Sequence, residues 1–354
     1  MKMVKFYQEI ISTKSKLANK SNEFSSGISN WYKKNGRENL PWRESISPYR
    51  IWISEIMLQQ TQVKTVIPFF NLFITKYPNL NTISKASEEN ILALWSGLGF
   101  YRRAKNIFKA KEIIRINFNN KFPIKFEEII SLPGIGKSTA GAIMSIAYRE
   151  PSPILDANVK RVISRYEGVE NDSSSSSIKE LWALSDKYTP SKDIFEYTQG
   201  IMDIGATICN TKTPECKACP LHKSCSSAFS TILKKEVLKK KTNPIRYIDY
   251  ELAYTDKYIL LFKRHEKTFW ESLWIPYEIV SEQRNPLISK KQVRKKVINI
   301  KHKLSHLDLD ITVKLIQYKE IFNLSTNLEY EWIKRDEVHK FGLPKPIKTI
   351  IEGI

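Results

Sequence analysis

The run Leu132-Pro133-Gly134-Ile135-Gly136-Lys137 lies between two segments whose apolar residues recur at helical spacing. Its two glycines allow a tight turn, and glycine lets backbone N–H groups approach a phosphate closely. The N-terminus of the following helix adds the positive end of its dipole. An ordinary connection between two helices has the same pattern. This run alone therefore leaves open a phosphate-binding turn and a plain helix–helix turn.

The region around this turn, from about Trp31 to Tyr166, has helical patterns throughout. Ser47 followed by Pro48 is typical of a helix start, because a capping side chain precedes a Pro in the first turn. Further helices are expected over 86–94, 103–116, 126–132 and 139–148, and no alternating strand pattern occurs among them. The serine-rich run 173–177 is expected to be a surface loop. The sequence therefore predicts an all-α domain here.

The composition and the hydrophobic pattern of the sequence change after residue 230. Lysines crowd residues 234–241, and Asn243-Pro244 follows, which is typical of a linker. Short alternating or β-branched runs then favour strands, and they lie at 248–254, 258–262, 307–313 and 315–318. We predict an N-terminal extension over 1–24, an all-α domain over 25–230, a linker over 231–246 and a smaller α+β domain over 247–354.

The chain of 354 residues carries 57 Lys and Arg against 37 Asp and Glu, a formal net charge of +20. This excess indicates nucleic acid first and an anionic membrane surface second, unless it is only a drift in surface composition. A hydrophobic content of 42% excludes wholesale disorder. No apolar stretch is long enough to span a bilayer, and residues 1–20 lack the apolar segment of a signal peptide. We expect a cytoplasmic, nucleoid-associated protein with no membrane partner.

The chain's four cysteines fall within one short segment, at Cys209, Cys216, Cys219 and Cys225. A disulfide framework would distribute them through the fold, so metal ligation is expected instead. Thiolates so close in sequence can hold one iron–sulfur cluster or one zinc ion. Common zinc modules pair two CxxC units, and this segment has a single one, which favours iron–sulfur.

Two carboxylates are candidates for chemistry. Glu55 shares a helix face with Ile51 and Leu58, and apolar surroundings would raise its pKa and keep it protonated near neutral pH. Asp156 directly precedes an apolar-periodic helix. Each has an ordinary alternative: Glu55 as one partner of a salt bridge and Asp156 as a helix cap.

The hairpin run and the segment 151–161 with Asp156 together resemble the signature of the helix-hairpin-helix DNA glycosylase superfamily. Within it, Trp52-Ile53-Ser54-Glu55-Ile56-Met57-Leu58-Gln59-Gln60-Thr61-Gln62-Val63 and Leu40-Pro41-Trp42-Arg43 closely resemble the A/G-specific adenine DNA glycosylases. The cysteine spacing resembles the loop of endonuclease III-type glycosylases, which implies one [4Fe–4S] cluster per chain. The resemblance is strong over roughly residues 30–230.

This resemblance implies an enzyme that flips adenine out of duplex DNA where it is paired with 8-oxoguanine or guanine, and hydrolyses its N-glycosidic bond. Glu55 would protonate the base at N7 and later activate water, and Asp156 would stabilise the cation that develops on the sugar. Bifunctional relatives carry a Schiff-base lysine where this chain has Ser138. No lyase activity is therefore expected, and the enzyme is expected to act as a monomer.

Further positions match family residues that contact DNA or support the site. Gly134, Gly136 and Lys137 match the DNA-binding hairpin, and Asn158 matches the residue that supports the catalytic Asp. Positions that match base-contacting or pocket-lining residues are Trp42, Arg43, Gln59, Gln60, Phe100 and Gln199. Phe100 replaces the usual Tyr, so a ring that can stack into the duplex is kept while its hydroxyl is lost.

The C-terminal domain carries a fainter resemblance. Phe269-Trp270-Glu271-Ser272-Leu273-Trp274-Ile275-Pro276 is similar to a strand of the Nudix-like fold, but the acidic metal-binding helix is missing. The run 301–307 resembles a family loop in which a Ser and a His lie close to 8-oxoguanine, so Ser305 and His306 are candidates for reading the opposite base. A turn with incidental polar residues is the alternative. The basic stretch 290–303 either adds phosphate affinity or forms a solvated face.

Three other functions stay open at this point: another base specificity in the same superfamily, a catalytically silent iron–sulfur DNA-binding protein, and a Nudix-type hydrolase. The presence of both Glu55 and Asp156 disfavours the silent protein. The missing acidic helix disfavours the hydrolase.

Overall fold

The computed structural model describes residues 20–230, 243–280, 285–287 and 292–354. Most of the predicted extension and linker, and residues 290 and 291 of the basic stretch, lie outside these ranges. Internal contacts divide the chain into two compact units. The first comprises Met1–Asn81 and Ala110–Lys234, and the second Thr82–Lys109 and Lys235–Ile354. The second unit thus includes a helical segment that the sequence analysis placed with the helical domain.

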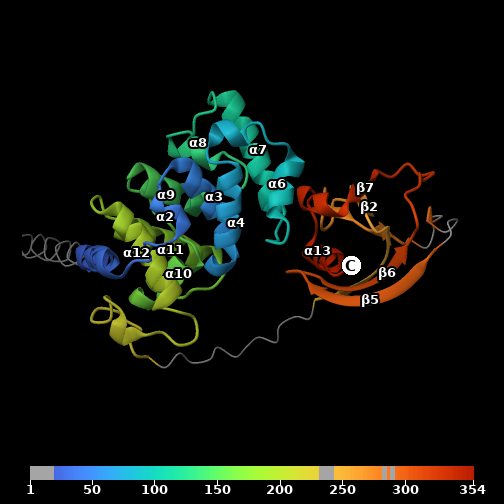
Figure 1. The fold of residues 1–354 in the computed structure, drawn as a ribbon. Helices are drawn as coiled ribbons and strands as arrows, with labels where there is room; N and C mark the ends of the chain where they lie inside the picture. Colours follow the sequence, from blue (N-terminus) through green and yellow to red (C-terminus); the bar gives the residue numbers. More distant parts are fainter. Residues whose placement is uncertain (1–19, 231–242, 281–284, 288–291) are drawn as a thin grey trace, which may run out of the picture. The chain divides into compact units, whose positions relative to one another are not determined.

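The first unit is helical throughout its described residues, as predicted. Residues 20–35 form its first helix. The helices that follow are α2 (Pro41–Glu44), α3 (Pro48–Leu58), α4 (Val63–Lys76), α8 (Phe126–Ile130), α9 (Lys137–Ile143), the π-helical η1 (Met144–Tyr148), α10 (Ala157–Glu167), α11 (Ser175–Tyr188), α12 (Ile194–Thr207) and the short η2 (Cys216–Ala218). Helices α5 (Leu80–Ile83) and α7 (Arg102–Asn117) cross the division between the units, and α6 (Glu88–Trp95) lies in the second. Figure 1 shows these helices in blue to yellow.

Serine caps set the start of two helices. The Ser47 side chain accepts a hydrogen bond from the backbone N–H of Arg50, so α3 begins where the sequence predicts. Ser174 does the same for Ser177 at the start of α11. The prediction of a surface loop over 173–177 is therefore wrong, because the run of serines supplies a cap and then continues as helix.

Two glycines let the elements around Asp156 approach closely. A Cβ on Gly141 of α9 would lie 2.3 Å from the Pro153 carbonyl oxygen, and one on Gly205 of α12 would lie 2.6 Å from Cβ of Asn158. Neither distance is available to a real side chain. Glycine at both positions therefore brings α9 and α12 against the segment that carries Asp156.

The second unit contains a mixed sheet, which confirms the predicted α+β region (Figure 1, orange to red). Its strands are β1 (Ile245–Tyr254), β2 (Tyr258–Lys263), β3 (Trp274–Ile275), β4 (Tyr277–Glu278), β5 (Arg294–Lys303), β6 (Asp308–Gln317) and β7 (Tyr330–Lys334). The order is β3-β2-β1-β6-β5, with β4 beside β1 and β7 beside β2. The 3-10 helix η3 (Arg335–Lys340) and α13 (Lys345–Glu352) follow the sheet.

Two strand predictions need correction. The runs 307–313 and 315–318 form one continuous strand, β6, which pairs in parallel with β1 from Ile245–Asp308 to Tyr254–Gln317. The basic stretch contains a strand, β5, which pairs with β6 in antiparallel fashion along its whole length. The lysines of this edge strand interrupt the alternation of apolar and polar residues by which a strand is predicted. No helix among the described residues is long and apolar enough to cross a bilayer.

Candidate active site

Helix α3 presents Glu55 from an otherwise buried surface. Its neighbours Ile51, Ile56 and Met57 are almost fully buried, and the carboxyl of Glu55 has no hydrogen-bond partner among the described residues. Burial, followed by the nearby Asp156 carboxylate, raises the pKa of Glu55 from 4.5 to about 7, against the opposing charge of Arg43. Glu55 therefore carries a proton for much of the time at neutral pH.

Asp156 is held at the N-terminus of α10. Its Oδ1 accepts a hydrogen bond of 2.8 Å from the backbone N–H of Val159, so the cap reading of the sequence describes its geometry correctly. Burial raises the pKa of Asp156, while hydrogen bonds from Val159 and Asn158 and the charge of Arg161 oppose that rise. Donors therefore stabilise the anion of Asp156, whereas the carboxyl of Glu55 has none among the described residues.

Ser138 lies in the first turn of α9 and supports the segment before Asp156. Its Oγ accepts a hydrogen bond of 2.9 Å from the backbone N–H of Leu155. The same helix carries Lys137, whose Nζ lies 4.1 Å from the ring centre of Trp182. Ser138 thus supports the backbone just before Asp156, and it has no amine.

The hairpin is joined to the end of α3. Gly134 has a φ of +84°, a conformation that favours glycine. Its carbonyl oxygen accepts a hydrogen bond of 3.2 Å from Nε2 of Gln59. Gln60, the next residue, is exposed and also has a left-handed backbone, with φ of 55°. The structure therefore brings Gln59 together with the hairpin, and leaves Gln60 on the surface.

Arg161 links Asn158 to the cysteine segment, a role that the sequence analysis missed. Its Nε donates to the Cys209 carbonyl at 2.6 Å, and its Nη2 donates to Oδ1 of Asn158 at 2.9 Å. A further bond runs to the Gly205 carbonyl. In the sequence, the only indication of this role is that Arg161 follows Asn158 by one helical turn.

The side chains of Arg43 and Trp42 both have partners within the helical unit. Nη1 and Nη2 of Arg43 donate to the two carboxylate oxygens of the fully buried Asp203, at 2.8 and 2.9 Å. Arg37 donates to the same carboxylate from its side chain and its backbone. Trp42 packs edge-on against Phe70.

This ion pair stabilises the charged form of Asp203, a residue to which the sequence analysis assigns no role. Burial alone would raise the pKa of Asp203, but the hydrogen bonds and charges of Arg43 and Arg37 together hold it below the usual value. Gln199, one turn earlier on α12, is 2% exposed, and its side-chain amide has no hydrogen bond to any described residue.

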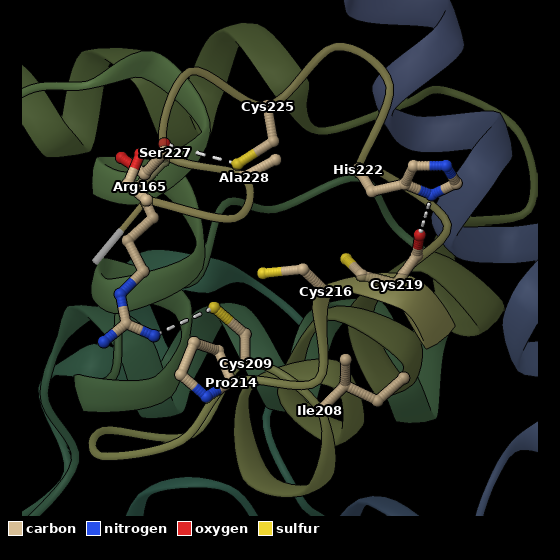
Figure 2. A pocket seen from close by; sticks show the side chains of 11 residues that line it. Arg165, Ile208, Cys209, Pro214, Cys216, Cys219, His222, Cys225, Ser227 and Ala228 are labelled. Carbon is tan, nitrogen blue, oxygen red and sulfur yellow. Dashed lines mark hydrogen bonds between the residues drawn. The ribbon is translucent and has the colours of Figure 1, made fainter. Parts of the chain in front are cut away.

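The four cysteines line one cavity of about 250 Å³, next to His222 and Arg165 (Figure 2). Arg165 donates to the Cys209 sulfur at 3.4 Å. Within the described residues, no three Cys, His, Asp or Glu side chains lie close enough to share a single metal ion. The four thiols thus belong to one cavity, and thiolates are ligands of both iron–sulfur clusters and zinc.

The other candidates lie in the second unit. Phe100 follows α6, with a side chain that is 46% exposed and a left-handed φ of 49°. Ser305 and His306 lie on the turn that joins β5 to β6, and both are exposed. Oγ of Ser305 lies 3.3 Å from Nδ1 of His306.

Comparison with known proteins decides the family. The chain is 42% identical to the adenine DNA glycosylase of Buchnera aphidicola subsp. Baizongia pistaciae, over 94% of this chain and 96% of that one. It is 38% identical to the enzyme of the same name from Buchnera aphidicola subsp. Schizaphis graminum, over 93% and 98%. The chain belongs to the adenine DNA glycosylase family. As an adenine DNA glycosylase it is an enzyme of base excision repair that hydrolyses an N-glycosidic bond in duplex DNA.

Both parts of this adenine DNA glycosylase match known families. Residues 53–187 match the HhH-GPD superfamily of base excision DNA repair proteins, and residues 251–353 match the NUDIX domain. A thermostable thymine-DNA glycosylase has a TM-score of 0.54 and 30% identity over 59% of this chain and 97% of that one. An endonuclease III–DNA complex has a TM-score of 0.51 at 22% identity over 60% and 96%, which shows the fold. The expected helix-hairpin-helix and Nudix-like architecture is thereby confirmed.

Proposed function

We propose that this adenine DNA glycosylase is monofunctional, acts as a monomer, and excises adenine paired with 8-oxoguanine or guanine. The observation that carries the proposal is the pair of unlike acids on α3 and α10. Glu55 has a pKa of about 7, and the hydrogen-bond donors around Asp156 lower its pKa against the effect of its burial. A proton donor beside a fixed anion suits the cleavage of a bond between a base and a sugar.

The reaction divides between these two groups. Glu55 donates its proton to N7 of the flipped adenine, so the base can leave with the electron pair of the glycosidic bond. Asp156 stabilises the positive charge that the sugar then acquires. Glu55, now ionised, takes a proton from the water that adds to the sugar carbon. Asn158 supports Asp156 by donating a hydrogen bond to it.

The remaining candidates would bind the DNA around this reaction. Gln199 would offer its side-chain amide to the adenine edge, and Trp42 and Arg43 would line the pocket of the base. Gln59, Gln60 and Phe100 would contact or separate the bases next to the extruded nucleotide. Gly134, Gly136 and Lys137 would hold a phosphate, and Ser305 and His306 would read the base opposite adenine.

The absence of lyase activity follows from Ser138. Its hydroxyl already accepts a hydrogen bond from the backbone of Leu155, and it has no amine with which to form an imine. The product would therefore be an intact strand with an abasic site. The reaction would take place in the cytoplasm at the nucleoid, where bacterial DNA lies.

The cysteines would hold one [4Fe–4S] cluster through Cys209, Cys216, Cys219 and Cys225. The cavity that they line supports this assignment, and the cluster would stabilise the fold of residues 209–225. Analysis of purified protein should give about four irons per chain. One zinc per chain with no iron would contradict the assignment. Cys216→Ser should lower the yield of soluble protein.

The specificity is tested with duplexes that place adenine opposite 8-oxoguanine, guanine, cytosine or thymine, followed by alkali to cut abasic sites. The proposal expects release of adenine opposite 8-oxoguanine and guanine, and no cleavage before alkali. The similarity to a thymine-DNA glycosylase makes a thymine–guanine duplex a useful fifth substrate. Preferential release of thymine, or strand cleavage without alkali, would contradict the proposal.

A further inference from the structure

A strained loop in the second unit presents Phe100. Gly97, Gly99 and Phe100 all have left-handed backbone conformations, with φ of 103°, 81° and 49°. Glycine adopts this conformation freely, but for a bulky residue such as Phe it costs free energy. The Phe100 side chain is nevertheless 46% exposed, so burial of its ring does not explain the conformation. Other contacts must hold the loop.

Both ends of this loop are hydrogen-bonded to one buried residue, Leu343. The Leu343 carbonyl oxygen accepts hydrogen bonds from Ser96 Oγ at 2.9 Å and from Tyr101 Oη at 2.8 Å. The Leu343 N–H donates back to Ser96 Oγ at 3.2 Å, and the Gly97 N–H donates to Tyr101 Oη at 3.1 Å. We call Ser96, Tyr101 and Leu343 the C-terminal anchor.

Helix α6 and the residues before Leu343 pack closely together, and this close packing allows the C-terminal anchor to form. A Cβ on Gly342 would lie 2.9 Å from Cβ of Leu92 on α6, so a larger residue next to Leu343 would force the two segments apart. Leu343 itself is 1% exposed and Ser96 is 6% exposed. Hydrogen bonds shielded from water in this way hold their geometry better than exposed ones.

A second set of contacts holds the middle of the loop. The Gly99 carbonyl accepts hydrogen bonds from Nε1 of Trp95 at 3.0 Å and from Nη2 of Arg103 at 3.1 Å. The guanidinium of Arg103 lies 5.3 Å from the ring centre of Phe100. These contacts come from the loop's own helices. The C-terminal anchor is what ties the loop to the β-sheet domain.

We propose that Tyr101 is a positioning residue: through Leu343 it holds the loop in the one conformation that aims Phe100 at the DNA. The C-terminal region then acts on the duplex in two ways, by reading a base and by presenting the stacking ring of another segment. Because the loop is already ordered before DNA binds, binding does not incur the conformational entropy cost of ordering it. This inference rests on the proposed stacking role of Phe100.

The test compares Tyr101→Phe with Tyr148→Phe. Both remove one partly buried hydroxyl that donates to a backbone carbonyl, Tyr148 to that of Pro123 at 2.9 Å. Single-turnover adenine release from an adenine–8-oxoguanine duplex is measured, together with the fluorescence of a 2-aminopurine next to the mispair, which reports unstacking. Tyr101→Phe should lower both the rate and the fluorescence change about tenfold, as expected for two lost hydrogen bonds. Tyr148→Phe should change neither.

The variant Phe100→Ala, alone and combined with Tyr101→Phe, separates the positioning role of Tyr101 from the stacking role of Phe100. If Tyr101 acts through Phe100, adding Tyr101→Phe to Phe100→Ala should not lower the rate of adenine release any further. One contrary result is that Tyr101→Phe lowers the rate as much in the Phe100→Ala enzyme as in the wild type, and another is that it leaves stacking normal. Either result would overturn the positioning role of Tyr101, while the stacking role of Phe100 would stand. Normal activity of Phe100→Ala would overturn the stacking role itself, and the inference with it.

Discussion

The two acids of the helical unit and the two polar residues of the β5–β6 turn are held very differently. Asp156 is fixed by backbone donors, and Arg161 joins its helix to the cysteine segment. Ser305 and His306 are exposed, and their side chains contact each other on a turn closed by a single backbone bond from Leu304 to Leu307. The groups to which we assign the chemistry on adenine are thus fixed within the fold, whereas the side chains to which we assign recognition of the opposite base are held only by each other.

The largest effect is expected at the acids. Glu55→Gln removes the proton donor and keeps the shape of the side chain, so adenine release should fall by about 10²–10⁴-fold while mispair binding is retained. Asp156→Asn should be similarly impaired. Single-turnover assays and gel-shift titrations check both expectations. Glu127→Gln, at an exposed position of α8, is the control and should behave as wild type. Near-normal release by Glu55→Gln would remove the role given to that residue.

A second large effect should appear in stability. Asp203→Asn leaves the guanidinium of Arg43, 5% exposed, without its anion, and should lower the free energy of unfolding by about 3–5 kcal/mol. The folded pKa of Asp203 lies below its usual value, so this stabilisation is present above about pH 4 and is lost as the pH falls through the folded pKa.

Urea unfolding of the iron-containing protein measures this loss. Asp193→Asn is the matched control, because its ion pair with Lys33 is exposed on both sides, and it should cost about 1 kcal/mol or less. Equal losses for the two variants would show that burial does not strengthen the Asp203 site.

A smaller effect is expected on the exposed turn. Ser305→Ala combined with His306→Ala should reduce the preference for 8-oxoguanine over guanine by about 1–3 kcal/mol and leave release opposite guanine nearly unchanged. The ratio of single-turnover rates on the two duplexes measures it. Ser325→Ala combined with His339→Ala changes the same residue types elsewhere on the exposed surface and should leave the ratio intact. A full preference in the first variant would mean that other residues read the opposite base.

The smallest effect is expected at the hairpin. Lys137→Gln should weaken binding of all duplexes alike and reduce the slope of log affinity against log salt by about one. Its partner Trp182 orients the ammonium group, so Trp182→Leu should weaken binding less and leave that slope unchanged. A change in base specificity in either variant would contradict a phosphate-binding role.

The elements that the sequence predicted correctly are those whose signals are local. Ser47-Pro48 marks the start of α3 and the glycines mark the hairpin, because caps and turns depend on a few adjacent residues. The strand β5 escaped prediction because lysines on its exposed edge break the alternation that marks a strand.

The parts of the site that the sequence missed depend on distant partners. Asp203 meets Arg43 across 160 positions, and Tyr101 meets Leu343 across 242. Nothing in the neighbourhood of either residue indicates its partner. Ser138 had been noted for the lysine that it replaces, and only the structure shows that it holds the backbone before Asp156.

The central claim, that Glu55 donates a proton beside an ionised Asp156, is tested most directly by the pH dependence of single-turnover adenine release from about pH 5 to pH 9. Protonated Glu55 is the active form, so the rate should fall as the pH rises through about 7. It should fall again at low pH, where Asp156, whose pKa is also raised, takes up a proton and loses the charge that stabilises the sugar cation. A rate that stays constant from pH 6 to about pH 9, or a Glu55→Gln enzyme that keeps the same decline above pH 7, would contradict the account.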